Sequence, residues 1–261
     1  MENPFAPTVL IEERGAVALV TLNRPEALNA SNPALHRAMA RIWRHLAEQP
    51  GLRAVVITGA GRAFCAGGDM ELFQALQDDH ATRQFLLDEA AQVVSEMAGF
   101  PLPVVAAVNG AAVGLGANVA LLSDLVVMGE SAYLCDPHVT VGLTAADGGA
   151  PLWPLFTSIL KVKEYLFTGA RIPAADAERM GFANRVVPDD EVVPAALELA
   201  GRLAEQPAHA LRTTKRAINM HVSRAVSGVL EYALSAEFQS FDTAEHREVV
   251  AKFLSKGGVK G

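Results

Sequence analysis

The chain has 261 residues, of which 51% are hydrophobic and 20% charged, and its formal net charge is −7. This balance is typical of a globular protein with a sizeable core, and an acidic chain without a long basic run argues against nucleic acid as a partner. The two cysteines, Cys65 and Cys135, indicate neither a disulfide framework nor a zinc site, which favours a reducing, cytoplasmic location. The N-terminal residues also lack the basic segment and apolar core of a signal peptide.

The first half of the chain alternates short apolar runs with helical patterns. Residues 8–22 alternate around Arg14-Gly15 and predict a β-hairpin. Pro33 begins a predicted helix that ends near Glu48. Further elements are predicted along the chain: strands over 53–58, 103–108, 125–128 and 132–134, and helices over 70–77, 82–98 and 114–122.

The second half is predicted to be mainly helical. Helices are expected over 151–168, 174–180, 189–204, 207–221 and 224–254, with one brief strand at 186–187. The order of elements favours an α/β core with parallel strands over residues 1–200, followed by a helical region over 201–261. Residues 97–123 carry no charge and are long enough to span a membrane, but their prolines, asparagines and glycines favour strand, turn and buried helix instead.

Two stretches, residues 54–69 and 103–118, follow the same pattern. Each is an apolar run typical of a buried strand, then a glycine-rich turn, then the start of a helix. Glycine lets a ligand approach the backbone closely, and the first N–H groups of a helix have no partner within the helix. Two such turns that face each other would stabilise one developing oxyanion.

Several blocks in the chain resemble the signature blocks of the crotonase superfamily, the enoyl-CoA hydratase/isomerase family. They are residues 23–29, 61–69 and 109–118, followed in order by 121–125, 167–171, 175–181 and 253–256. The resemblance implies a spiral of repeated ββα units, with a C-terminal helical region that supports a homotrimer or a hexamer built as a dimer of trimers. It also implies an acyl-CoA thioester as substrate, with no other cofactor and no metal. The charge and the breaks in residues 97–123 argue against nucleic acid and against a membrane as partners.

The resemblance also assigns roles to individual positions. It places the two oxyanion donors on the backbone N–H groups of Ala66 and Leu115. It places coenzyme A against nine residues: Arg24, Ala27, Leu28, Ala63, Phe64, Asp69, Met70, Phe253 and Lys256.

The chain departs from the family at the acid/base positions. The resemblance implies two glutamates in the hydratases, and Asn118 and His138 stand in their places. Asparagine can hold a water molecule but cannot transfer a proton at neutral pH. Histidine can, and a carboxylate on its far nitrogen, for which Asp147 is the candidate, would fix its tautomer and raise its basicity.

Three functions remain open from the sequence. The first is an acyl-CoA hydratase or isomerase with His138, Asp147 and Asn118 as its catalytic residues. The second is a hydrolase of carbon–carbon bonds in β-diketones, because the spacing of His138 and Asp147 resembles the oxocamphor hydrolase branch. The third is a non-catalytic acyl-CoA binder. Structural roles also remain open: a hydrogen-bonded histidine at 138, a helix cap at 147, and packing at 118.

Overall fold

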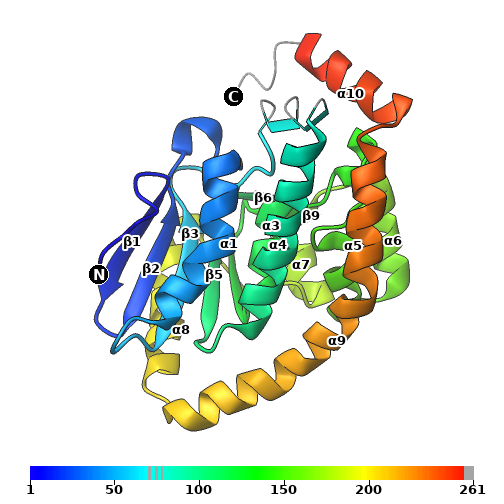
Figure 1. Ribbon diagram of the computed structural model, residues 1–261. Helices are drawn as coiled ribbons and strands as arrows, with labels where there is room; N and C mark the ends of the chain where they lie inside the picture. The colour runs from blue at the N-terminus through cyan, green and yellow to red at the C-terminus, as the bar shows by residue number, and fades with distance from the viewer. Residues whose placement is uncertain (70–71, 74–75, 78, 256–261) are drawn as a thin grey trace.

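A six-stranded sheet forms the centre of the computed structural model, which describes residues 1–69, 72–73, 76–77 and 79–255 (Figure 1). Its strands lie in the order β1 (Val9–Arg14), β2 (Val17–Leu22), β3 (Ala54–Gly59), β5 (Val104–Val108), β7 (Leu125–Gly129) and β10 (Arg185–Val187). The hairpin of β1 and β2 is antiparallel, as predicted, and the other neighbours are parallel.

A second sheet of four very short strands lies beyond the ends of the first. Its order is β4 (Ala63–Cys65), β6 (Ala111–Val113), β8 (Tyr133–Cys135) and β9 (Ile172–Pro173). Strands β4, β6 and β8 each follow a long strand of the first sheet after a tight turn, so the units β3–β4, β5–β6 and β7–β8 repeat one arrangement. The sequence prediction found β8 but assigned β4 and β6 to the glycine turns.

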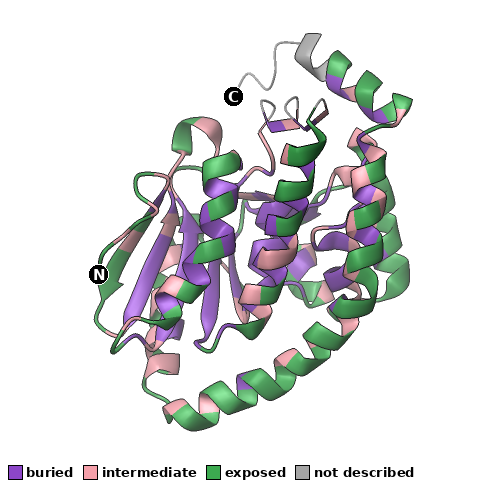
Figure 2. Ribbon diagram, in the orientation of Figure 1, coloured by how far each residue is buried: buried purple, intermediate pink, exposed green. Residues whose placement is uncertain are grey.

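Helices cover both faces of the large sheet. On one side lie α1 (Pro33–Ala47), α3 (His80–Gly99) and α4 (Leu115–Leu122), and on the other lies α8 (Val192–Ala204). The alternation of strand side chains assigns each to one layer: Val55 and Ile57 of β3 join the α1 side, whereas Ala54 and Val56 join the α8 side. Both faces are therefore buried, as parallel strands require. Figure 2 shows β2, β3 and β5 almost wholly buried, whereas the edge strand β1 is largely exposed.

The remaining helices are α5 (Gly149–Leu152), α6 (Ile159–Thr168), α7 (Ala174–Met180), α9 (Ala208–Ser240) and α10 (Ala244–Ser255). The predicted helix over 151–168 is wrong in its middle, because a 3₁₀ turn over Trp153–Leu155 interrupts it before Ser158 caps α6. The predicted break near residue 222 is also wrong, since α9 runs unbroken for 33 residues.

The predicted α/β class with parallel strands is confirmed, and the division at residue 200 stays a prediction. In the part of the chain that the structure describes, no helix has the length and apolarity that crossing a membrane requires.

Candidate active site

The two predicted glycine turns lie next to each other, because the strands that lead into them, β4 and β6, are paired. Gly67 and Gly114 have φ angles of +90° and +50°, a backbone conformation that favours glycine. At the start of α4, a Cβ atom on Gly116 would lie 2.5 Å from the carbonyl oxygen of Cys65 in the other turn, which is too close for any side chain. The sequence therefore requires glycine here to bring the two turns together.

Two backbone N–H groups at these turns are free to bind an anion. Leu115 is the first residue of α4, so its N–H has no partner within the helix. Ala66, the other donor implied by the family resemblance, instead donates its N–H to the carbonyl oxygen of Leu28 at 3.1 Å, and that assignment is corrected. Gly68, two residues later, has no hydrogen-bond acceptor for its N–H among the described residues, and it lines a cavity at these turns.

The cavity at the turns has a volume of about 150 Å³. Leucines of α3 form an apolar part of its wall, and Gly68 and Leu115 belong to its lining. Five titratable side chains belong to its lining, and three of them lie close together: His138, Asp147 and Glu237. The candidate site thus combines anion-binding backbone with proton-transfer groups in a small enclosure.

His138 is held by a different carboxylate from the one predicted. Its Nδ1 lies 2.5 Å from Oδ1 of Asp136, whereas its Nε2 lies 3.7 Å from Oδ1 of Asp147 and 3.8 Å from Oε1 of Glu237. The first distance is a hydrogen bond and the other two are not. Asp136 therefore orients the ring, and Asp147 and Glu237 lie near the nitrogen that remains available.

The carboxylates decide the charge of His138. Burial alone would lower the pKa of its imidazole, but Asp136, Asp147 and Glu237 together outweigh burial and hold this pKa well above 6.5. Burial and the neighbouring acidic groups raise the pKa of Glu237 to about 8. Burial likewise raises the pKa of Asp147, against the opposing effect of His138. At neutral pH the histidine is therefore a proton donor rather than a base.

Asn118 is buried and positions Asp147. Its Nδ2 donates to Oδ1 of Asp147 at 2.9 Å, and its Oδ1 accepts from the Trp153 indole at 3.3 Å. Gly148 allows the close approach, because a Cβ atom there would lie 2.3 Å from Cγ of Asn118. Asn118 stands where the family has a glutamate, and its hydrogen bond places the carboxylate of Asp147 close to that position.

Two residues of this cluster were missed from the sequence. Asp136 stands only two residues before His138, and this spacing was a usable signal. Glu237 comes from α9, and no local pattern singles it out. Asp136, His138 and Asp147 also offer ligand atoms within 4.8 Å of one another and are the described residues that could hold a metal ion. Such an ion would compete with the hydrogen bond from His138 to Asp136.

A second cavity, of about 540 Å³, adjoins the first. Ala66, Gly68 and Phe73 line both cavities. Hydrophobic residues of α10, Val249 and Val250, form part of the second wall.

The predicted coenzyme A contacts divide between this cavity and other places. Ala27, Leu28 and Asp69 line it. Arg24 binds Asp69 at 3.2 Å and donates to the carbonyl of Ala30. Ala63 and Phe64 are buried in β4 and line neither cavity, so contacts to their side chains are not supported. Met70, Lys256 and the Phe253 side chain lie outside the described residues.

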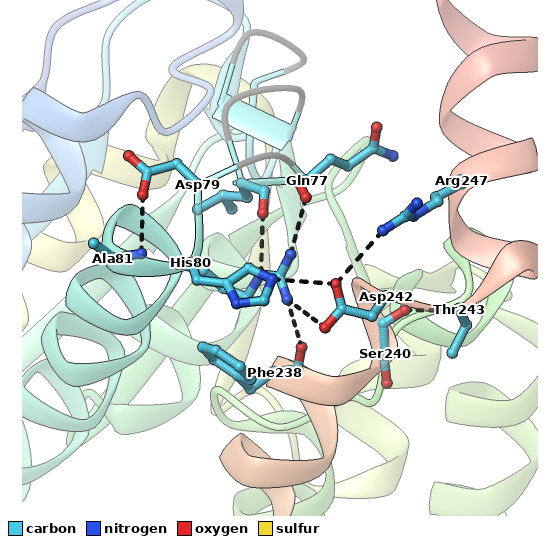
Figure 3. Close-up of polar contacts among 11 residues, drawn as sticks. Gln77, Asp79, His80, Ala81, Phe238, Ser240, Asp242, Thr243 and Arg247 are labelled. Carbon is cyan, nitrogen blue, oxygen red and sulfur yellow. Dashed lines mark hydrogen bonds and ion pairs between the residues drawn. The ribbon is translucent and has the colours of Figure 1, made fainter.

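Arg83 of α3 joins the cavity wall to the junction of α9 and α10. Its guanidinium donates to the carbonyl oxygens of Leu76, Gln77 and Phe238 and to Oδ2 of Asp242 at 3.0 Å. Figure 3 shows Gln77, Phe238 and Asp242 gathered around this guanidinium, with Asp242 also facing Arg247. The network fixes the end of the helix that carries Glu237.

Comparison with known proteins gives one consistent result. A family model described as enoyl-CoA hydratase/isomerase matches residues 12–260. The structure is similar to a crystal structure of an enoyl-CoA hydratase/isomerase from Mycobacterium paratuberculosis, with a TM-score of 0.93 and 47% identity over 96% of this chain and 100% of that chain.

Two curated proteins are also similar over nearly their full length. A probable enoyl-CoA hydratase from Rhodobacter capsulatus is 33% identical over 95% of both chains. The 1,2-epoxyphenylacetyl-CoA isomerase of Escherichia coli is 32% identical over 94% of both chains.

Proposed function

The chain belongs to the enoyl-CoA hydratase/isomerase family, and we propose that it hydrates or isomerises a short enoyl-CoA with a histidine–carboxylate pair in place of two glutamates. The observation that carries this proposal is the meeting of the two cavities at Gly68. A thioester that spans them would place its acyl group in the small cavity and its coenzyme A arm in the large one. Its carbonyl would then lie at the free N–H groups of Gly68 and Leu115.

The two backbone donors would stabilise the negative charge that develops on the thioester oxygen. Polarising this carbonyl makes the β-carbon electrophilic and the α-carbon acidic. One preorganised donor contributes about 3–4 kcal/mol to such a transition state. Gly68 replaces Ala66 in this role, because the Ala66 N–H is already used within the protein.

Asp147 and His138 would carry out the proton transfers, because both line the small cavity and lie close to each other. Asp147, with its raised pKa, takes a proton from water while the water oxygen bonds to the β-carbon. The imidazolium of His138 then gives a proton to the α-carbon of the enolate. Asp147 returns its proton to Nε2 of His138, which lies 3.7 Å away, and the cycle closes. In an isomerisation the same two groups would remove and return a proton of the acyl chain.

Glu237 supports this cycle as a neutral neighbour. A pKa of about 8 keeps its carboxyl group protonated at neutral pH, so it adds no full charge beside Asp147. Asp136 keeps its place behind the ring and holds the imidazole orientation throughout.

The test is turnover of crotonyl-CoA and hexenoyl-CoA, followed by loss of absorbance of the conjugated thioester. We expect turnover that falls by about 10²–10⁴-fold in Asp147→Asn and in His138→Gln, with acyl-CoA binding retained. Asp190→Asn, at an exposed position, is the matched control. Equal turnover in all four proteins would refute the assigned roles.

The same experiment separates the alternative functions. Cleavage of a cyclic β-diketone with no binding of coenzyme A would favour the carbon–carbon hydrolase. That alternative needs Asp147 to orient His138, and the hydrogen bond to Asp136 weighs against it. Tight acyl-CoA binding without turnover over a broad panel would favour the non-catalytic binder.

We also propose that the chain assembles into a trimer or a dimer of trimers. Large apolar side chains remain exposed in the single chain, including Leu160 at 80%, Tyr232 at 76% and Phe167 at 65%. Exposed apolar surface of this kind marks interaction sites. Light scattering of the purified protein measures the assembly directly, and a monomer would refute it.

A further inference from the structure

A second histidine reaches the small cavity from α1. His36 is only 8% exposed, and its Nδ1 lies 3.0 Å from Oε2 of the buried Glu89 on α3. Arg37 holds the other oxygen of Glu89 at 3.4 Å. The Nε2 of His36 makes no hydrogen bond within the described part of the chain, and His36 belongs to the lining of the cavity. This nitrogen is therefore available to a ligand in the cavity.

Ser31 provides a second unused polar group on the same wall. Its hydroxyl is buried and has no hydrogen-bond partner among the residues that the structure describes, although Ser31 lines the cavity. Its backbone pairs with Gly68, so it lies beside the proposed thioester position. A buried hydroxyl without a partner costs about 1–3 kcal/mol, and a ligand oxygen would remove that cost.

The charges around the cavity select the kind of oxygen. Asp136 and Asp147 lie at His138 and would repel a second carboxylate. Arg83, the fully buried cation in the wall, already donates four hydrogen bonds, one to the carboxylate of Asp242 and three to backbone carbonyls. An uncharged oxygen, in a hydroxyl or a ketone, is the group that this wall accepts.

We propose that Ser31 and His36 bind an uncharged oxygen substituent on the acyl group, so that the preferred substrate is a short oxygenated acyl-CoA rather than a simple fatty acyl-CoA. The inference rests on the proposed function for the location of the thioester. With its Nδ1–H donating to Glu89, the His36 ring presents Nε2 as an acceptor for a hydroxyl of the substrate. Ser31 can serve either group, because a hydroxyl both donates and accepts.

The volume limits the size of the acyl group. A cavity of about 150 Å³ is comparable to the engineered protein cavity of the same volume that binds benzene, which has six non-hydrogen atoms. The substituted carbon must therefore lie within a few bonds of the thioester.

The test uses unreactive saturated thioesters as well as substrates. Calorimetry compares hexanoyl-CoA with counterparts that carry a hydroxyl or a ketone at the penultimate carbon, and turnover compares the matching hexenoyl-CoA thioesters. We expect at least one oxygenated ligand to bind about tenfold more tightly than the alkyl ligand. In Ser31→Ala and His36→Leu this preference should fall to near unity, with alkyl affinity kept. His209→Leu, at an exposed position on α9, should keep the preference.

The outcomes separate this inference from the proposed function. Turnover of the alkyl substrate without any preference would overturn the oxygen site alone. Preferential binding without turnover would support the oxygen site and overturn the proposed reaction. Because His36→Leu leaves Glu89 without a partner, His36→Leu combined with Glu89→Gln repeats the test in a chain free of that unpaired charge. An equal loss for alkyl and oxygenated ligands in this double variant would also overturn the inference.

Discussion

Asp136→Asn is the substitution that examines the proton-donor role of His138 most directly. The asparagine oxygen can still accept the Nδ1 proton of His138, so the ring orientation is preserved while one negative charge is removed. Two carboxyl groups, Asp147 and Glu237, then remain to oppose burial, and the pKa of His138 must fall. The imidazole consequently spends less time as the proton donor at neutral pH.

The size of the effect follows from the contact that is lost. A hydrogen bond between charged groups contributes about 1.5–3 kcal/mol to stability, and the 2.5 Å contact to a fully buried carboxylate belongs at the upper end. The catalytic cost is bounded by the worth of general acid catalysis, about 10²–10⁴-fold in kcat.

The sign of the pH dependence is fixed by the direction of the shift. A histidine whose pKa is raised on folding adds stability that is complete below its ordinary value of 6.5 and is lost as the pH rises through the raised value. Asp136→Asn should therefore show its largest loss of stability in mildly acidic solution. Its loss should shrink in alkaline solution, and the alkaline limb of its kcat profile should move towards neutral pH.

The assays are urea unfolding and enoyl-CoA turnover across this pH range, with Asp190→Asn as the control for removal of a carboxylate. The reasoning is refuted if the Asp136→Asn profiles superimpose on those of the wild type. It is also refuted if the deficit in stability grows as the pH rises.

Three further substitutions have expected outcomes. Leu115→Pro removes the proposed N–H donor at the first position of α4, where proline is tolerated, and kcat should fall by about 10²–10³-fold. Leu115→Ala keeps the N–H and should keep most of kcat, so equal losses in the two variants would exclude the donor role. Glu237→Gln should flatten the dependence of the unfolding free energy on pH. The raised pKa of Glu237 adds stability that is complete below pH 4.5 and is lost as the pH rises through about 8. An unchanged slope of unfolding free energy against pH would contradict this prediction. Arg83→Met should lower the unfolding free energy by about 1–3 kcal/mol, because it leaves three backbone carbonyls without their donor. Arg247→Met, at the exposed end of the network, should change it by no more than about 0.5 kcal/mol, and similar midpoints would refute the difference.

The large sheet was predictable from the sequence because its strands have continuous apolar runs bounded by clear turns. The small sheet was not, since β4 and β6 have three residues each and lie within the glycine-rich turns. Their pairing depends on contacts between segments distant in the chain, which local patterns do not contain. The same limit explains α9, where weak amphipathicity gave no reason to join two predicted helices into one.

The candidate site was predictable where a residue type and a family block coincide, as at His138 and Leu115. It was not predictable where the role of a residue depends on the hydrogen bond of its backbone N–H group. The sequence alone could not show that the Ala66 N–H is consumed by Leu28, because that bond depends on the path of the loop at residues 24–29. It also could not place Glu237 or Glu89, which enter from helices that carry no signature.

Asn118 and Asp147 show how proton-transfer chemistry can survive the loss of a carboxylate from α4. A glutamate at 118 would carry its own charge into the cavity, whereas the asparagine imports one from the loop after β8 through a 2.9 Å hydrogen bond. Asp147 thereby lies 3.7 Å from Nε2 of His138, and Glu237 of α9 lies 3.8 Å from the same nitrogen. The electrostatic environment of His138 therefore depends on the position of α9. The chemistry of the site is consequently tied to the Arg83 network that anchors α9, and a substitution at Arg83 should alter the pH profile of turnover as well as stability.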